Sequence, residues 1–285
     1  MRAVLREALR QSTPGTIKLF RRWGAFDVSQ PCERDALDRP LPYWVIGEGR
    51  PLLYLHAAGG PQISPFLEEL ARSHRVLMPI APGFEGTPFH PAVKTVRDLA
   101  GLYAEFAQAV IGTACDVMGH SFGGWTALWL AVSHSDCVDQ LVLEAPAGLR
   151  FGAAAAPPRN PEELRRKLYA YPEKAKALIK PPEVASANAE AFARYHGGIL
   201  VDEALLASLS QIKARTLIVM ATKDEMIPAK AGHVLKERIR ASHLTYIYDA
   251  AHAIEVDQPE RLLWLVKAFL ERGEAYIVNF GDEAA

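Results

Sequence analysis

The sequence predicts an α/β fold: a mostly parallel, twisted sheet with helices on both faces, and a helical segment inserted near the middle of the chain. Two observations support this prediction. Short apolar runs alternate with longer helix-like stretches along most of the 285 residues, and this alternation is typical of parallel sheets covered by helices. Most of the apolar runs are also continuous rather than interrupted by polar residues, as expected of strands buried on both faces.

The expected strands and helices can be placed in order along the chain. The stretch "YWVIGEGRPLLYL" has a Gly-Glu-Gly centre and is expected to form a β-hairpin that leads into the first buried strand. The buried strands are expected at Leu52–Leu55, Val76–Met78, Asp116–Met118, Leu141–Leu143, Thr216–Met220 and Leu244–Tyr248. The helices are expected at Pro65–Ser73, Val96–Ile111, Gly123–Val132, Ala229–Ile239 and Pro259–Glu271.

Residues 150–211 break this pattern. The segment has no strand-like run, is rich in Ala, Pro and charged residues, and is expected to form several short helices separated by prolines. It is too long for a simple crossover loop, so we expect a helical cap inserted above the sheet. The core is then made of residues 40–149 and 212–285. Residues 1–39 are expected to be an N-terminal helical extension.

Composition and charge narrow the classes of function. The formal net charge is −1 and no basic stripe is interleaved with aromatic residues, which argues against a nucleic-acid partner. Cys32, Cys115 and Cys137 lie far apart and favour reduced thiols in a cytoplasmic protein. No apolar run approaches the roughly 18 residues of a membrane span. The N-terminus lacks the features of a secretory signal; a transit peptide is the alternative, against which Glu7 counts.

The first chemical signal is "VMGHSFGGWTALWLAV", residues 117–132, where an expected strand turns directly into an expected helix. It contains G-x-S-x-G in the strand–turn–helix context that this motif requires. The turn strains the backbone of Ser121, and Gly119 and Gly123 must lack side chains to avoid a collision across it. Ser121 then stands at a helix N-terminus, which favours developing negative charge. The alternative is a tight turn whose serine only caps the helix.

A serine hydroxyl needs a base that accepts its proton and an acid that orients the base. Two later segments can supply these groups. The stretch "TLIVMATKDEMIP" is an expected strand followed by a loop with Asp224, and "LTYIYDAAHAIEVDQPERLL" is an expected strand followed by a loop with His252. Serine, aspartate and histidine therefore occur in the chain order that enzymes with such a turn use.

Taken together, these segments resemble the α/β-hydrolase family, and within it the serine hydrolases with a helical cap. The resemblance covers roughly residues 40–272. "LYLHAAGG" resembles the family's H-G-x-G-G strand end at the oxyanion hole, and "RVLMPIAPGFEGT" is similar to its strand followed by P-G-x-G-x-S. "GHSFGG" is similar to the nucleophile elbow, "ATKDEMIP" to the acid loop, and "AHAIEVDQPERL" to the G-H-x-x-x-x-E-x-P-E segment. These motifs are specific for the fold and the triad, and much less so for the substrate.

The resemblance implies roles for five residues. Ser121 would be the nucleophile, His252 the general base and later the acid, and Asp224 the carboxylate that holds the imidazole. The oxyanion hole would use the backbone N–H groups of Phe122 and Ala58. No pair of His or Cys residues on one expected element has the spacing of metal ligands, so we expect neither a metal nor a cofactor.

The chain departs from the family pattern at four positions, none of which removes a catalytic group. Ala57 and Ala251 stand where the family usually has glycine, Asp257 stands in place of a glutamate, and Glu85 is an extra residue within P-G-x-G-x-S.

Several other residues have alternative interpretations. Glu144 ends a buried strand at the same edge of the sheet and is an alternative triad acid, although we expect it to anchor the start of the insertion. His56 is expected to make structural hydrogen bonds near the oxyanion loop, and His120 to pack away from the pocket. His196 is expected to lie exposed at a helix end, with substrate contact as the alternative. Four aromatic residues are expected to pack the insertion onto the sheet and to line a pocket roof: Tyr169, Tyr171, Phe192 and Tyr195.

We therefore expect a serine hydrolase that acts on a small, partly apolar carbonyl substrate, either an ester or a carbon–carbon bond next to a ketone. A nucleophilic serine argues against the haloalkane and epoxide chemistry of related enzymes, which uses a carboxylate. An acyltransferase with the same triad is one alternative, and a non-catalytic ligand-binding protein on the same scaffold is another. A homodimer is one possible assembly.

Overall fold

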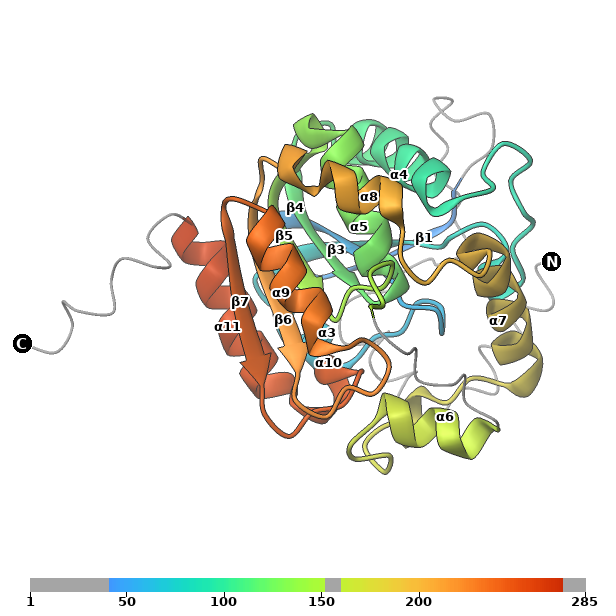
Figure 1. The fold of residues 1–285 in the computed structure, drawn as a ribbon. Helices are drawn as coiled ribbons and strands as arrows, with labels where there is room; N and C mark the ends of the chain where they lie inside the picture. Colours follow the sequence, from blue (N-terminus) through green and yellow to red (C-terminus); the bar gives the residue numbers. More distant parts are fainter. Residues whose placement is uncertain (1–40, 152–159, 274–285) are drawn as a thin grey trace, which may run out of the picture.

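The computed structural model describes residues 41–151 and 160–273 (Figure 1). The expected N-terminal helical extension, residues 1–39, lies outside the described residues. Within them, a seven-stranded sheet has the order β1-β3-β2-β4-β5-β6-β7. All neighbouring strands are parallel except β1, which is antiparallel to β3. The strands are β1 Tyr43–Ile46, β2 Arg50–Leu55, β3 His74–Pro79, β4 Cys115–His120, β5 Val138–Glu144, β6 Arg215–Ala221 and β7 Ser242–Ile247.

The predicted hairpin is wrong, because β1 and β2 are not neighbours. Strand β3 lies between them and pairs with both. The Gly-Glu-Gly stretch instead carries the chain across the start of β3. A Cβ atom on Gly47 would lie 2.1 Å from the carbonyl oxygen of Ala71, and Gly47 has a φ of +75°. Glycine is therefore required by a close crossing of two segments, rather than by a two-stranded turn.

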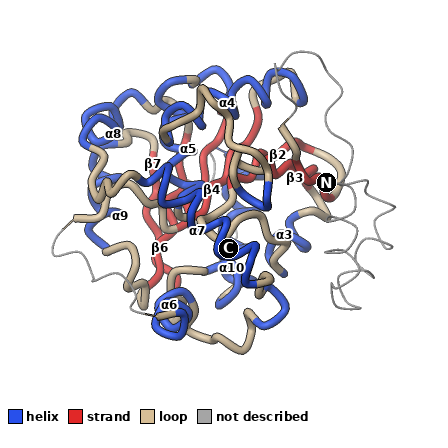
Figure 2. The backbone as a smooth tube through the Cα atoms, turned by 90° about the vertical axis from the view of Figure 1, so that its right-hand side faces the viewer, coloured by secondary structure: helices blue, strands red, loops and turns tan. Residues whose placement is uncertain are grey.

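Helices cover both faces of the sheet, and Figure 2 shows the strands enclosed between them. One face packs against α4, α5 and α9, and the other packs against α3, α10 and α11. The five predicted helices are present, with ends shifted by up to three residues. The described helices are α3 Pro65–Leu70, α4 Val96–Val110, α5 Phe122–Ser133, α6 Pro161–Leu168, α7 Pro182–His196, α8 Glu203–Ser208, α9 Ala229–Arg238, α10 Ile254–Asp257 and α11 Pro259–Arg272.

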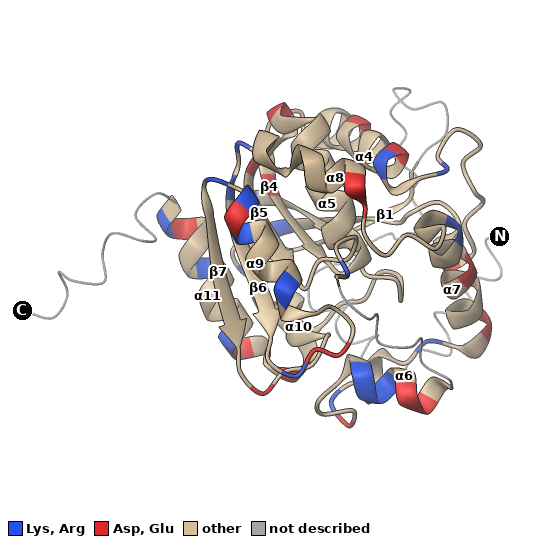
Figure 3. Cartoon of the chain, viewed as in Figure 1, with Lys and Arg blue, Asp and Glu red and all other residues tan. Residues whose placement is uncertain are grey.

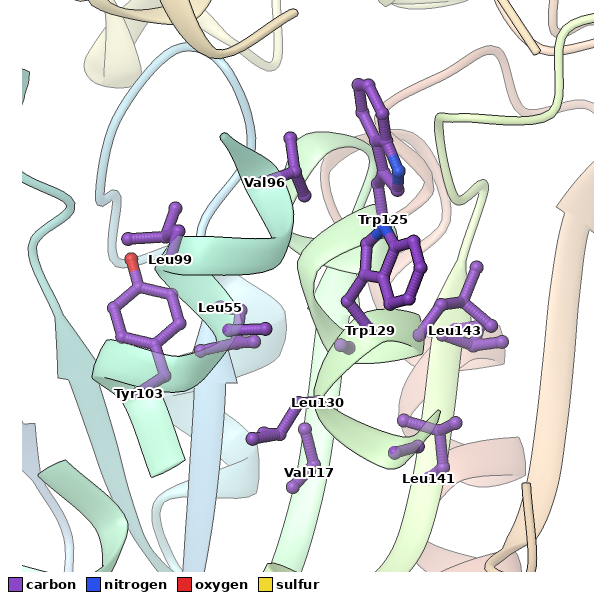
Figure 4. Packing of buried hydrophobic residues seen from close by; sticks show 14 of the residues in the cluster. Leu55, Val96, Leu99, Tyr103, Val117, Trp125, Trp129, Leu130, Leu141 and Leu143 are labelled. Carbon is purple, nitrogen blue, oxygen red and sulfur yellow. The ribbon is translucent and has the colours of Figure 1, made fainter. Parts of the chain in front are cut away.

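Helix α5, which follows Ser121, lies at the centre of the core. Ten of its residues are buried, and Figure 4 shows its side chains between those of α4 and those of the central strands. Trp125 and Leu130 pack in the same layer as Val117 and Leu143. A helix that is apolar all round is typical of a fully buried position. The burial of α5 therefore fixes the position of Ser121, the residue that precedes it.

The segment between β5 and β6 contains α6, α7 and α8, and its described residues include no strand longer than a single bridge. In Figure 1 α6 and α7 lie to one side of the sheet, apart from the helices that cover its faces. The segment leaves and rejoins the core at one place, where Leu149 pairs with Val201. The assignment of residues 150–211 as a cap stays a prediction.

Charged residues of both signs are spread over the described helices and loops in Figure 3, and both signs occur on α6 and α11. Among the described residues, no helix combines the length and the apolar character needed to cross a membrane.

Substitution of Gly123 by alanine is expected to destabilise the protein. A Cβ atom there would lie 1.9 Å from the carbonyl oxygen of Leu55 in β2, so helix α5 would have to move away from the sheet. We expect a loss of at least about 2 kcal/mol in the free energy of unfolding, measured by urea denaturation.

Gly101→Ala is the matched control. Gly101 lies inside α4, and the nearest atom that a new Cβ would meet beyond its own helix backbone is Nε2 of His134, at 3.8 Å. Alanine in place of glycine inside a helix is expected to stabilise by up to about 1 kcal/mol. Equal effects of the two substitutions would contradict the close packing of α5 on β2.

Candidate active site

Ser121 occupies a strained turn between β4 and α5, as the G-x-S-x-G motif predicts. Its backbone has a φ of 54° and a ψ of −111°, a conformation that non-glycine residues rarely adopt. The turn is held by hydrogen bonds: the N–H of Ser121 donates to the carbonyl oxygen of Glu144, and its own carbonyl oxygen accepts from Ala147, both at 2.9 Å. A Cβ atom on Gly119 would lie 2.4 Å from the carbonyl oxygen of Gly123. The predicted collision across the turn is confirmed.

The structure brings Ser121, His252 and Asp224 together in one hydrogen-bonded chain. Nε2 of His252 lies 2.8 Å from Oγ of Ser121, and its Nδ1 lies 2.9 Å from Oδ2 of Asp224. The three residues follow β4, β7 and β6, whose carboxyl ends lie at one edge of the parallel sheet. The His252 residue is 3% exposed, so water competes little for these hydrogen bonds.

The environment of Asp224 keeps it ionised. Burial alone would raise the pKa of Asp224, but the neighbouring His252 ring and two backbone N–H groups hold it below its usual value. These groups belong to Met226 and Ile227, which donate to Oδ1 at 2.7 and 2.9 Å. Because Oδ1 is occupied, Oδ2 is left to accept from the imidazole, which fixes the tautomer with hydrogen on Nδ1.

Both predicted oxyanion donors lie near the ends of β2 and β4. Phe122 is the first residue of α5, so its N–H group has no acceptor within the helix. Ala58 lies in a turn closed by the N–H of Gly60, which donates to the carbonyl oxygen of Ala57 at 2.9 Å. A tight turn with a fixed peptide plane is a suitable support for a backbone donor.

His120 does more than the predicted packing. The residue is 4% exposed, and its Nε2 donates to the carbonyl oxygen of His252 at 3.1 Å, while the two rings lie 5.1 Å apart between centroids. Burial and the neighbouring His252 lower the pKa of His120 to about 3, so it is neutral near pH 7. It therefore supports the His252 loop from behind.

Glu144 is not positioned as the triad acid, because the His252 ring binds Asp224. The prediction that Glu144 anchors the start of the insertion is also wrong. Its Oε1 accepts from the backbone N–H of Glu255 in α10 at 2.9 Å, so it holds the helix that follows His252. Burial, followed by the negative charge of Glu255, raises the pKa of Glu144 well above its usual value.

Glu255 completes this buried group, and the sequence does not predict its role. Its Oε2 accepts from the hydroxyls of Tyr54 at 2.9 Å and Ser64 at 3.0 Å. Burial raises the pKa of Glu255 to about 7. No signal in one sequence marks it, because its partners come from separate elements and meet only in the folded chain.

The other histidines and the departures from the family pattern also have defined places. His56 makes the predicted structural hydrogen bonds: Nδ1 donates to the carbonyl oxygen of Ala57 at 2.8 Å and Nε2 accepts from Ala81 at 3.1 Å. His196 ends α7 as predicted but is half-buried, with its ring 6.1 Å from that of Trp125.

Asp257 accepts from the N–H of Ala251, next to His252 in the chain, at 2.8 Å.

Asp257 also connects the insertion to this loop. Its two carboxylate oxygens accept from the N–H groups of Ala170 at 2.9 Å and Tyr171 at 3.1 Å. The carbonyl oxygen of Leu168 accepts from the N–H of Ala253, one residue after His252, at 2.9 Å. The end of α6 and the residues after it are thus bound directly to both sides of His252.

The described residues contain no group of three or more His, Cys, Asp or Glu side chains arranged to hold a metal ion. Cys115 and Cys137 are free and buried; Cys32 lies outside the described ranges. Burial raises the pKa of Cys115 to about 12, so its thiol is neutral near pH 7.

Comparison with known proteins identifies the family of the chain. The model of the alpha/beta hydrolase family matches residues 52–263. The chain belongs to the α/β-hydrolase family, and the predicted fold class is confirmed.

Several relatives of known activity are similar along most of the chain. A 2-hydroxymuconate semialdehyde hydrolase from Pseudomonas sp. (strain CF600) is 28% identical over 82% of this chain and 91% of that protein. A pimeloyl-[acyl-carrier protein] methyl ester esterase from Neisseria meningitidis serogroup B (strain H44/76 of serotype 15) is 28% identical over 65% of this chain and 81% of that protein. Together with the family match, these relatives indicate a hydrolase.

A meta-cleavage product hydrolase from Pseudomonas fluorescens IP01 has a similar structure. The two superpose with a TM-score of 0.68 at 20% identity, covering 82% of this chain and 94% of that one. This likeness supports the fold.

The buried carboxyl group of Glu255 is expected to make folding stability depend on pH. Its pKa is about 7 in the folded protein, against a usual value of 4.5. Between pH 4.5 and pH 7 the unfolded chain releases this proton, whereas the folded chain keeps it. The contribution of Glu255 to the free energy of unfolding is therefore complete below pH 4.5 and is lost as the pH rises towards 7. Urea denaturation at pH 5 and pH 8 is expected to show a loss on the order of 2 kcal/mol, part of which Glu255→Gln removes, since the neighbouring Glu144 also has a raised pKa.

Glu105→Gln is the control, because Glu105 is an exposed carboxylate on α4. That variant should keep the pH dependence of the native protein. If Glu255→Gln and the native protein lost stability equally between pH 5 and pH 8, the carboxyl group would have to be ionised in the fold.

Proposed function

We propose that the protein is a serine hydrolase in which Ser121 attacks a carbonyl carbon. The observation that carries this proposal is the hydrogen-bonded chain from Ser121 through His252 to Asp224, with distances of 2.8 and 2.9 Å. A nucleophile bonded to a base, and a base bonded to an orienting carboxylate, is the arrangement that activates a serine hydroxyl.

Proton transfer in the first step follows from this arrangement. As Ser121 Oγ bonds to the carbonyl carbon, its proton passes to Nε2 of His252, and the imidazole becomes positively charged. The ionised carboxylate of Asp224 stabilises that charge through its hydrogen bond to Nδ1. His252 then gives the proton to the leaving group, and in the second half of the reaction it activates water that releases the product.

The negative charge that develops on the carbonyl oxygen of the substrate must be stabilised by hydrogen-bond donors that are already in position. The N–H groups of Phe122 and Ala58 are proposed for this role, and the N-terminal end of α5 adds its dipole. One backbone donor of this kind contributes on the order of 3 kcal/mol to stabilisation of the transition state.

The segment of residues 150–211 is proposed to act as a cap over Ser121. Its aromatic residues support this role: the ring of Phe192 meets that of Phe122 edge to face at 5.6 Å, and the ring of Tyr195 lies 5.7 Å from it. Ser121 itself is only partly buried. A partly apolar surrounding of this kind favours a small, partly apolar substrate.

The substrate is proposed to be either a carboxylic ester or a compound with a carbon–carbon bond next to a ketone. The relatives described above are named for a semialdehyde and for a methyl ester. Assay of short p-nitrophenyl esters beside a vinylogous diketone acid would separate these classes. Preferred turnover of one class by a factor of at least about 100, which corresponds to about 3 kcal/mol of differential transition-state binding, would identify it.

A cytoplasmic location is proposed on the basis of the free thiols of Cys115 and Cys137.

A fluorophosphonate probe is expected to label the native protein at Ser121. The Ser121→Ala variant should not be labelled, and His252→Ala should be labelled much more slowly because it lacks the base. Gel fluorescence and peptide mass spectrometry measure both outcomes. A native protein that is folded but not labelled would favour a ligand-binding protein over an enzyme.

Asp224→Asn is expected to fold normally and to lose activity by roughly 10⁴-fold in kcat, since the amide cannot hold the imidazole in the required tautomer. The reference variant is Glu144→Gln, which alters a buried carboxyl group that does not contact His252. It is expected to stay within roughly a factor of ten of native activity. The reverse ranking would make Glu144 the triad acid.

A further inference from the structure

Asn188 in α7 lies outside the triad, yet its side chain connects the insertion to the proposed oxyanion loop. The residue is 1% exposed. Its Nδ2 donates to the carbonyl oxygen of Gly59 at 2.8 Å and to Oε1 of Glu85 at 2.7 Å, and its Oδ1 accepts from the N–H of Glu85 at 2.8 Å. A buried amide whose nitrogen and oxygen are both bonded holds its partners in one arrangement.

The Gly59–Gly60 peptide is held on both sides. Its carbonyl oxygen accepts from Asn188, and its N–H donates to the carbonyl oxygen of Ala57 at 2.9 Å. In a trans peptide the C=O and N–H bonds point in opposite directions, so these two hydrogen bonds together fix the plane of the peptide.

The Ala57–Ala58 peptide is fixed in turn. Its carbonyl oxygen, that of Ala57, accepts from Gly60 and also from Nδ1 of His56, at 2.8 Å. The direction of this carbonyl sets the opposite direction of the Ala58 N–H in the same peptide. Two hydrogen-bonded peptide planes therefore connect the amide of Asn188 to the proposed oxyanion donor.

The insertion supports the same loop at a second point. Nζ of Lys180 donates to the carbonyl oxygen of Pro61 at 2.8 Å and forms an ion pair with Oε1 of Glu85. The carboxylate of Glu85, the extra residue in the P-G-x-G-x-S pattern, thus accepts hydrogen bonds from both Asn188 and Lys180. Its backbone has a φ of 53°, and the surrounding hydrogen bonds hold this uncommon conformation.

We propose that Asn188 is a positioning residue for the oxyanion hole. By holding the Gly59–Gly60 peptide, it directs the N–H of Ala58 towards the position where negative charge develops on the substrate. This inference rests on the proposed function. It follows that the oxyanion hole is complete only while α7 is docked against residues 57–61.

Asn188→Ala tests the proposal. Hydrolysis of p-nitrophenyl acetate is expected to show kcat lower by about 10- to 100-fold, with KM changed by less than about 3-fold, since the lost support matters mainly in the transition state. The inhibition constant of a trifluoromethyl ketone, which forms a tetrahedral adduct with the serine, should rise by the same factor as kcat/KM falls.

Asn160→Ala is the matched control. Asn160 lies in the same insertion, and its side chain accepts from the N–H of Glu163 at the start of α6. Loss of this cap lowers stability but leaves the loop after β2 untouched, so kcat and the inhibition constant should stay native.

The double variant E85Q/N188D keeps the shape of the buried group, and urea denaturation of each variant separates a folding defect from the loss of the donor. The amide introduced at position 85 can donate to the carboxylate introduced at position 188, so the link between the two positions is retained. The ionised carboxylate cannot donate to Gly59 and places an acceptor opposite its carbonyl oxygen. If Asn188 acts through Gly59, the double variant should be as slow as Asn188→Ala. Native kcat in the double variant, or in Asn188→Ala, would overturn the proposal.

Failure of the proposed function gives a different result. In that case the native protein itself would not hydrolyse esters or bind the trifluoromethyl ketone, and both the proposed function and the role of Asn188 would be contradicted. A native protein that is active, together with native kcat in either Asn188 variant, overturns the role of Asn188 alone.

Discussion

The hydrogen bond between His252 Nε2 and Ser121 Oγ is the contact on which the arrangement of this protein depends. The two residues are 131 positions apart in the chain. They meet because β4 and β7 belong to one sheet and both end at the same edge. The strained backbone of Ser121 presents its hydroxyl there, and the close packing of α5 on β2 holds that strain. The core therefore does more than stabilise the fold, since it places the proposed nucleophile within reach of the proposed base.

Two layers of polar contacts surround this bond. Behind His252, the His120 ring and the buried Glu144 and Glu255 hold the loop and the helix that follow β7. On the other side, the insertion is bound to the His252 loop through Asp257 and to the turn after β2 through Asn188. One inserted segment thus contacts both the loop that carries His252 and the loop proposed to carry an oxyanion donor. Its docking supports both loops.

Much of the fold could be predicted from the sequence, because continuous apolar runs, G-x-S-x-G and the order serine, aspartate, histidine are local signals. The buried group around Glu255 could not, since its partners Tyr54 and Ser64 lie 201 and 191 residues away in the chain. The hairpin error has a similar cause: a Gly-Glu-Gly stretch marks a turn, but it does not show which strand lies beside β1. The sequence places Glu144 at the edge of the sheet where Ser121, Asp224 and His252 lie, yet only the fold shows which group its carboxylate faces.

The most direct test of the central claim is to trap the covalent intermediate. The native protein would be mixed with p-nitrophenyl acetate, quenched in acid within the first turnovers, digested, and its peptides identified by mass spectrometry. We predict an acetyl group on Ser121, formed together with a rapid initial release of p-nitrophenol. Acetylation of another residue, or steady hydrolysis with no acyl group on Ser121, would contradict a nucleophilic role for this serine.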